Sequence, residues 1–206
     1  ISFTGSDATG ARVYETAART MKRVSLELGG KSPNIVFDDA DLDLAAAGVI
    51  SGIFGAAGQM CTAGSRLLVH KSIKEVFTEK LLHLARGIKL GDPMDPGTNV
   101  GPITTPPQYQ KVLHYIDVAR ADGARCILGG KPATGPGLIG GQFVEPTIFA
   151  DVTNDMRIAQ EEVFGPILSI IEFDDEAQAV RIGNDVAYGL VAAVWTKSLG
   201  RAMRMS

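Results

Sequence analysis

Residues 26–37 read LELGGKSPNIVF and contain the Gly-Gly-Lys-Ser sequence of a phosphate-binding loop. That loop requires a further glycine five residues before Gly30, where this chain has Ser25. It also requires a helix directly after the lysine, whereas Pro33 pushes the residue before it out of helical geometry. The stretch is therefore predicted to join a strand at 23–28 to a second strand that begins at Pro33. A nucleoside triphosphate site is excluded.

The segment before this stretch contains a second candidate anion site. FTGSDATG (3–10) places Gly5 and Ser6 between a first strand and a helix that runs to about Met21. Ser6 or Asp7 is expected to cap that helix. The free backbone N–H groups and the dipole at such a helix start favour an anion. The full G-x-G-x-x-G pattern is absent, so a phosphate contact and a simple capped turn both remain open.

The segment after this stretch alternates strands with helices. Further strands are expected at 66–71, 124–128, 143–149, 167–173 and 190–195. Helices are expected after Asp41 and at about 72–86, 108–121, 176–184 and 198–206. Ser72 and Glu75 have the spacing of a capping box. This alternation predicts an α/β fold of three layers, with a largely parallel sheet and flanking helices.

The composition is typical of a soluble globular protein, with 45% hydrophobic and 21% charged residues. Its 206 residues suffice for one domain, or for one domain and part of another. The net charge of −3 gives no reason to expect nucleic acid or an anionic membrane as a partner. Two cysteines without disulfide or metal spacing, and three scattered histidines, indicate a reducing compartment and no metal site. We therefore expect a cytoplasmic protein.

The first cysteine lies in GQMCTAGSR (58–66), among small residues. A nucleophilic thiolate needs an open approach and nearby backbone N–H groups, which such a segment can provide for Cys61. A buried structural cysteine in a packed helix has the same composition, so both interpretations stay open at this point. Cys126 lies in a strand-like run and is expected to be structural.

Five motifs of the chain resemble those of the aldehyde dehydrogenase superfamily. They share its order and approximate spacing, and the resemblance extends from end to end of the chain. Members of the superfamily are more than twice as long, and this chain corresponds to their middle-to-late section. The five motifs are FTGS (3–6), LELGGKSPN (26–34), GQMCTAGSR (58–66), Gly-Pro-Ile (101–103) after a proline-rich loop, and EEVFGP (161–166).

The resemblance implies the reaction and its catalytic residues. Cys61 would be the nucleophile that attacks an aldehyde, and its own backbone N–H would donate to the oxyanion. Glu27 would be the general base that activates water to hydrolyse the thioester. Relatives that pass the acyl group to coenzyme A generally lack a carboxylate at this position, so Glu27 favours a free carboxylic acid as the product. A coenzyme A-dependent enzyme and a non-catalytic scaffold remain the alternatives.

The resemblance also implies a nicotinamide cofactor, NAD or NADP. Glu162 would bind the ribose hydroxyls next to the nicotinamide, and Phe164 would lie beside that end of the cofactor. Ser6 would approach the pyrophosphate. Thr4 and Gly5 would lie under the nicotinamide ring.

Three residues near these motifs complete the implied site. The Leu28 carbonyl would meet the nicotinamide carboxamide, while Met60 and Thr62 flank the nucleophile and would contact the aldehyde. The two glycines after Leu28 would let backbone pass close to the cofactor and the cysteine, because only a residue without Cβ permits such an approach. Lys31 has no implied role and is taken as a surface or structural lysine.

The resemblance finally implies a division of the chain. Residues 1–28 would be the C-terminal remnant of a Rossmann-like cofactor domain, and 29–206 most of the catalytic domain, truncated at its C-terminal end. An asparagine that completes the oxyanion hole, and the contacts to adenosine, belong to earlier parts of the family pattern. The chain alone is therefore expected to have no appreciable dehydrogenase activity. The full-length protein is expected to be a homodimer or homotetramer.

Overall fold

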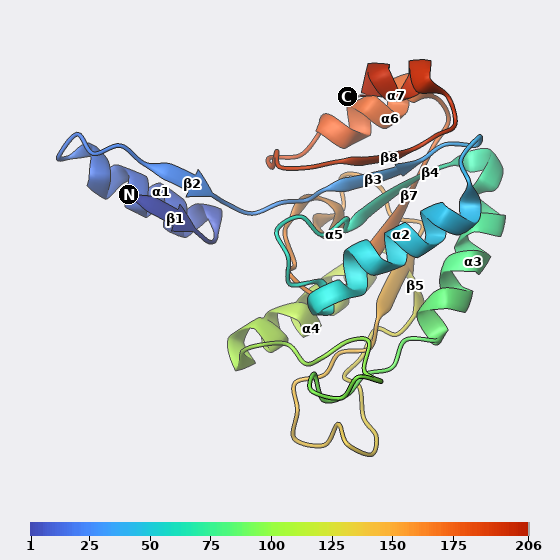
Figure 1. Ribbon diagram of the computed structural model, residues 1–206, viewed down its shortest axis with the longest axis horizontal. Helices are drawn as coiled ribbons and strands as arrows, with labels where there is room; N and C mark the ends of the chain where they lie inside the picture. Colours follow the sequence, from blue (N-terminus) through green and yellow to red (C-terminus); the bar gives the residue numbers. More distant parts are fainter. Residues whose placement is uncertain (206) are drawn as a thin grey trace.

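The computed structural model describes residues 1–205, which form two separate β-sheets (Figure 1). The smaller sheet contains β1 (Ser2–Thr4) and β2 (Ser25–Glu27), which are parallel and are connected through helix α1 (Asp7–Ala18). This β1–α1–β2 unit lies to one side of the larger sheet in Figure 1, and an extended linker joins the two. Residues 28–32 form this linker, with no helix after the lysine.

The larger sheet has six strands in the order β5-β6-β7-β4-β3-β8. All neighbouring pairs are parallel except β5 and β6. The central strands are mostly apolar and almost wholly buried, as expected for strands covered on both faces. The strands are β3 (Pro33–Val36), β4 (Arg66–His70), β5 (Arg125–Leu128), β6 (Thr147–Ala150), β7 (Ile167–Phe173) and β8 (Ala193–Trp195).

Helices flank this sheet (Figure 1), which confirms the predicted α/β fold with a largely parallel sheet. Within residues 1–205, no helix combines the length and apolar character needed to cross a membrane. The α-helices are α2 (Leu42–Phe54), α3 (Lys74–Arg86), α4 (Pro106–Ala121), α5 (Arg157–Gln160), α6 (Glu176–Asn184) and α7 (Leu199–Met205). Two 3-10 helices, η1 (Gly55–Gly58) and η2 (Lys71–Ile73), precede β4 and α3.

The predicted start of α2 is confirmed by its cap. The Asp41 carboxylate accepts the backbone N–H groups of Asp43 and Leu44, each at 3.1 Å. Ser6 occupies the N-cap position of α1, but its hydroxyl donates to the Thr9 hydroxyl at 3.1 Å and caps no backbone N–H. The Ser6 side chain is therefore not committed to the helix backbone.

The capping box predicted for α3 is wrong. Ser72 lies inside η2, and α3 begins only at Lys74. The residue at the N-cap of η2 is His70, whose ring Nδ1 accepts the Ser72 N–H at 3.4 Å. Because the chain already turns at Lys71, the serine lies inside that turn and cannot cap the helix.

Three predicted strands are shorter than expected. The strand expected at 23–28 covers only Ser25–Glu27. The strand expected at 143–149 begins only at Thr147, because Pro146 has no N–H to donate to a neighbouring strand. The strand expected at 190–195 begins at Ala193. The short helix α5 was not expected, since a run of four residues carries no helical period.

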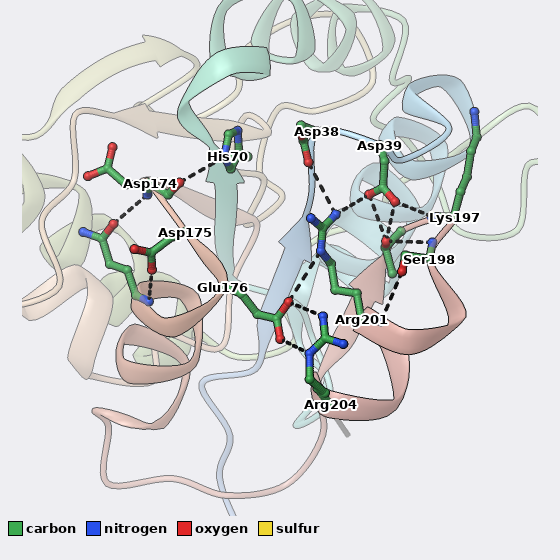
Figure 2. Close-up of polar contacts among 12 residues, drawn as sticks. Asp38, Asp39, His70, Asp174, Asp175, Glu176, Lys197, Ser198, Arg201 and Arg204 are labelled. Carbon is green, nitrogen blue, oxygen red and sulfur yellow. Dashed lines mark hydrogen bonds and ion pairs between the residues drawn. The ribbon is translucent and has the colours of Figure 1, made fainter.

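Ion pairs hold α7 against the sheet (Figure 2). Arg201 contacts Asp39 at 2.7 Å and Asp38 at 3.4 Å, both in the turn after β3. Arg204 donates two hydrogen bonds, of 2.6 and 2.8 Å, to the carboxylate of Glu176, which lies in the first turn of α6. These contacts fix the last helix of the described chain beside α6 and the end of β3.

The Arg66 side chain joins three parts of the fold. It is fully buried, and its Nε donates to the Lys31 carbonyl at 2.8 Å. Its Nη atoms donate to the carbonyls of Ile182 and Gly183 at 2.9 and 2.8 Å, and to Asn154 Oδ1 at 3.3 Å. Arg66 thereby connects β4 with the linker and with the end of α6.

We expect Arg66→Met to lower the free energy of unfolding by about 3–5 kcal/mol, because it leaves buried carbonyls without donors. Urea denaturation of the variant measures the change. Arg125→Met is the matched control, since Arg125 is 63% exposed and pairs only with Asp151 at 2.8 Å. That control should cost less than about 1 kcal/mol. Equal losses in the two variants would contradict the role of Arg66.

Candidate active site

A cavity of about 440 Å³ lies where the linker, the small sheet and the turn before β4 come together. Its wall includes nine of the ten residues predicted for the site. From the cofactor side these are Thr4, Gly5, Ser6, Leu28, Glu162 and Phe164, and from the nucleophile side Met60, Cys61 and Thr62. Segments distant in the sequence therefore meet at one cavity.

Cys61 lies in a turn between η1 and β4, not in a packed helix. Its side chain is half-buried and free of any disulfide. Within residues 1–205, the Cys61 N–H donates to no acceptor, so it is available to a ligand in the cavity. The open approach and the free N–H are the two features that a nucleophilic cysteine needs. Cys126 instead lies in β5, and its Sγ contacts the Leu128 carbonyl at 3.3 Å.

The chain before Cys61 is bent into a left-handed turn. Ala56 and Ala57 have positive φ angles of 49° and 54°, and Gly58 follows at 70°. A Cβ added to Gly58 would lie 2.1 Å from the Gly165 carbonyl oxygen. Only glycine permits this approach, which packs the Cys61 turn against the segment at 161–166.

The two glycines of the linker lie between Cys61 and Glu162. A Cβ on Gly30 would be 2.2 Å from the Cys61 carbonyl oxygen, and one on Gly29 would be 2.8 Å from Glu162 Oε2. The Gly30 N–H donates to Glu162 Oε1 at 3.0 Å. The predicted close approach to the cysteine is confirmed for Gly30, and the hydrogen bond from its N–H also orients the Glu162 carboxylate.

A side chain of α4 holds the segment that carries Glu162 and Phe164. Phe164 has a φ of 59°, a conformation that a bulky residue rarely adopts without support. Gln108 of α4 supplies that support, because its Nε2 donates to the carbonyls of Val163 and Phe164, each at 2.8 Å. Gln108 also lines the cavity, and no motif in the sequence pointed to it.

Glu161, the neighbour of Glu162, is anchored on the other side of this segment. Arg157 donates to its carboxylate at 2.9 and 3.0 Å, and the Tyr115 hydroxyl donates at 2.5 Å. The bonds from Arg157 and Tyr115 lower the pKa of Glu161 to about 2. Burial, and the hydrogen bond to Glu161, raise the pKa of Tyr115 to about 12. Glu161 is therefore ionised and fixed across the neutral pH range.

We expect Glu161→Gln to destabilise the protein at pH 6 by about 1 kcal/mol, since the carboxylate is 40% exposed and solvent screens its ion pair. The folded-state pKa lies below the ordinary 4.5, so this stabilisation is present above pH 4.5 and is lost as the pH falls towards 2. Urea denaturation of both proteins at pH 6 and pH 3 should show the difference shrinking at pH 3. A difference independent of pH would contradict the assignment, and Glu79→Gln, an exposed change on α3, serves as the control.

Glu27 is the one predicted site residue that does not line the cavity. Its side chain is exposed at the end of β2, while its carbonyl accepts the Gly5 N–H at 3.0 Å. The next residue, Leu28, does line the cavity. Glu27 is therefore adjacent to the site, with its carboxylate in solvent.

Two further residues of the cavity wall were not predicted, Gln59 and Lys111. The Gln59 Oε1 accepts both the N–H and the hydroxyl of Thr104, at 3.0 and 2.8 Å, which joins the cysteine turn to the proline-rich loop. Lys111 brings a cation from α4. Among the described residues, no group of three or more histidine, cysteine or carboxylate side chains could hold a metal ion.

Comparison with known proteins agrees with this arrangement. A profile of the Aldehyde dehydrogenase family matches residues 1–206. A betaine aldehyde dehydrogenase of Cereibacter sphaeroides is 46% identical over 205 residues, which are 100% of this chain and 42% of that protein. The betaine aldehyde dehydrogenase of Brucella anthropi has the same identity and coverage. The chain thus spans about 42% of the length of the curated relatives it matches.

Solved structures show the same similarity. The betaine aldehyde dehydrogenase of Staphylococcus aureus, crystallised in complex with NAD+, is 44% identical with a TM-score of 0.97. The match covers 99% of this chain and 40% of that chain. HpcC of Thermus thermophilus is 47% identical with a TM-score of 0.96, at 99% and 40% coverage. PnpE in complex with nicotinamide adenine dinucleotide is 45% identical with a TM-score of 0.97, at 100% and 42%.

Proposed function

Because the chain belongs to the aldehyde dehydrogenase family, we propose that it carries the nucleophile and the nicotinamide-side contacts of an NAD(P)-dependent enzyme. The whole protein would oxidise an aldehyde to a carboxylic acid. One observation carries the proposal: Cys61 and Glu162 line the same cavity, joined through the linker glycines that contact both. Betaine aldehyde is the first substrate to test, since relatives at 46–47% identity are named for it.

The proposed reaction begins at Cys61. Its thiolate attacks the aldehyde carbon, a carbon–sulfur bond forms, and the carbonyl oxygen becomes an oxyanion. The free N–H of Cys61 donates to that oxygen as the charge develops. Loss of a hydride from the same carbon leaves a thioester on Cys61. Glu27 then removes a proton from water, which attacks the thioester carbon and releases the acid and the thiolate.

The residues around the cavity fit the nicotinamide half of a dinucleotide. The N terminus of the 12-residue helix α1 opens beside Gly5 and Ser6, where backbone N–H groups and the helix dipole favour a phosphate. The Glu162 carboxylate can accept hydrogen bonds from a pair of ribose hydroxyls, beside Phe164. Thr4 and the Leu28 carbonyl would contact the nicotinamide end. When bound, NAD+ or NADP+ accepts the hydride.

Membership of the family also supports a proposal on the domain organisation of the chain. Residues 1–28 would be the end of a Rossmann-like cofactor domain and 29–206 most of a catalytic domain. The separation of the β1–α1–β2 unit from the six-stranded sheet favours this boundary. In the whole protein we expect a homodimer or homotetramer.

Two alternative functions make different predictions. A coenzyme A-dependent enzyme would release an acyl thioester in place of the free acid, and the carboxylate of Glu27 disfavours it. A non-catalytic scaffold would leave Cys61 inert, and the position of Cys61 in an open cavity disfavours that. Product analysis by mass spectrometry, with and without coenzyme A, distinguishes the first alternative from hydrolysis.

We expect the whole protein to form NADH or NADPH from betaine aldehyde or a short aliphatic aldehyde, and the 206-residue chain alone to show no appreciable turnover. The chain alone lacks the adenosine contacts and the second oxyanion donor of the family pattern. Loss of one such donor costs a factor of about 10² to 10³ in rate. Absorbance of the reduced cofactor measures both reactions. Turnover by the chain alone at the rate of the whole protein would contradict this expectation.

A further inference from the structure

Gln59 lies two residues before Cys61, and both ends of its side-chain amide are engaged. Its Nε2 donates to the Ala56 carbonyl at 3.3 Å, and the Gln59 backbone N–H donates to the same oxygen at 3.1 Å. Its Oε1 accepts the N–H and the hydroxyl of Thr104, at 3.0 and 2.8 Å. The proposed reaction assigns no part to Gln59, so these contacts need an explanation of their own.

The turn that Gln59 closes is strained. Ala56 has φ and ψ angles of 49° and 32°, and Ala57 has angles of 54° and 32°, so both lie in the left-handed region. A residue with a Cβ is unfavourable there and stays only where its surroundings hold it. The backbone and the side chain of Gln59 both hold this turn, because each donates to the Ala56 carbonyl. Loss of the side-chain amide would let the two alanines relax and would move Cys61, which follows them.

Thr104 is a fixed anchor for the Gln59 amide. Ile103, before it, is only 2% exposed, and its N–H donates to a backbone carbonyl at 2.8 Å. Thr105, after it, is the N-cap of α4, and Pro106 and Pro107 occupy the first two positions of that helix. The proline rings fix φ at both positions. Because the backbone is held on either side of Thr104, the Gln59 amide is attached to a rigid part of the chain.

The same stretch of backbone holds the opposite side of the cavity. Gln108 of α4 donates to two carbonyls of the segment at 161–166, each at 2.8 Å. Residues 104–108 therefore hold that segment through Gln108 and the cysteine turn through Gln59. The spacing between the two sides of the cavity depends on both contacts. Such spacing matters for a reaction, since a misplacement of about 1 Å can lower a rate by a factor of about 10².

We propose that Gln59 is a positioning residue for Cys61. Its amide, attached to Thr104, keeps the left-handed turn in the geometry that leaves the Cys61 thiol and N–H open to the cavity. Both ends of the amide are engaged, so Gln59 acts through the turn and not by contact with the reacting atoms. The kinetic consequence rests on the proposed dehydrogenase function, whereas the structural consequence needs no turnover.

Gln59→Met tests the proposal in the whole protein, because methionine has a similar length and neither end of the amide. The kcat for aldehyde oxidation should fall about tenfold to a hundredfold, since the nucleophile is misplaced. The dissociation constant of the cofactor should stay at the wild-type value, because Gln108 still holds the segment that carries Glu162. Gln110→Met, at an exposed glutamine of α4, is the matched control and should change neither constant.

Two variants of Thr104 test the same contact while Gln59 is kept. Thr104→Val removes the hydroxyl and should lower kcat about threefold to tenfold, the effect of one lost hydrogen bond. Thr104→Ser keeps the hydroxyl and should have the wild-type kcat. This pair also decides the question if Gln59→Met does not fold. Equal kcat values in the valine and serine variants would overturn the proposal.

A crystal structure of Gln59→Met gives a readout that is independent of activity. Ala56 and Ala57 should leave the left-handed region, and Cys61 should be displaced in the cavity wall. Unchanged positive φ angles with Cys61 in place would overturn the proposal, even where the wild-type protein oxidises aldehydes. A relaxed turn in the variant, together with a wild-type protein that oxidises no aldehyde, would overturn the proposed function and support the role of Gln59 in the turn.

The kinetic constants separate positioning from direct binding. A raised dissociation constant of the cofactor with an unchanged kcat would make Gln59 a cofactor contact and overturn the proposal. A lower free energy of unfolding with both constants unchanged would make its role only structural and would overturn it as well.

Discussion

Replacing Cys61 with alanine is expected to abolish aldehyde oxidation by the whole protein, lowering kcat/KM by a factor on the order of 10⁴ to 10⁶. The expected loss is this large because no covalent intermediate can form without the thiolate, and the remaining groups only bind and orient the reactants. Formation of reduced cofactor at saturating aldehyde measures the effect. Cofactor binding should persist, since the variant keeps Glu162 and the N terminus of α1.

Cys126→Ala is the matched control for Cys61→Ala and should keep full activity, because Cys126 lies in β5 and outside the cavity. Iodoacetamide supplies a second readout on the chain itself. Cys61 should be alkylated faster than Cys126, as mass spectrometry of digests would show. Equal or inverted labelling, together with residual turnover in Cys61→Ala, would favour the non-catalytic scaffold.

Replacing Glu27 with glutamine should slow steady-state turnover by a factor of about 10² to 10⁴, the usual contribution of a general base. The first oxidation should remain fast, because Glu27 acts only on the water that cleaves the thioester. Rapid-mixing measurements should therefore show a burst of reduced cofactor, close to one equivalent per Cys61, followed by a slow phase. The wild-type protein should show no burst followed by a slow phase.

Glu15→Gln is the control for the Glu27 variant, since it changes an exposed glutamate on α1 that pairs only with Arg19. A Glu27→Gln protein with unchanged steady-state turnover would assign the base to another residue. A slow first turnover without a burst would place Glu27 in the oxidation step. The test is informative because the Glu27 side chain points to solvent in the described structure, and it must turn towards the cavity to act as proposed.

The sheet was predictable from local patterns. The central strands at Pro33, Arg66 and Ile167 are short and mostly apolar, and the alternation with helices predicts parallel pairing. The capping box at Ser72 failed because His70, two residues earlier, had already capped the chain. The sequence pattern alone does not show which of two possible capping residues is used, because the end of β4 determines where the turn begins.

The site was predictable only where its residues belong to motifs. Cys61 and Glu162 lie in short stretches that resemble a family, and both line the cavity. Gln108 and Lys111 reach the same cavity from α4, whose sequence shows only an ordinary helix. The burial of Lys31 was not predictable either, because it depends on neighbours distant in the sequence, among them Arg66 and Glu162.

The linker at 28–32 has a consequence for how the protein tolerates sequence change. Five consecutive residues provide part of the wall of the Cys61 cavity, the glycines that contact Cys61 and Glu162, and part of the wall of a second cavity, at Lys31. Inserting or deleting a single residue there displaces all three at once, so the segment is constrained in length as well as in composition. The turns at the exposed Gly137 and Gly140 carry no such constraint in length, since nothing lies within 4 Å of a Cβ added at either; their φ angles of 80° and 84° constrain only the residue type. Variation in length between related chains should therefore concentrate in those turns and be absent from the linker.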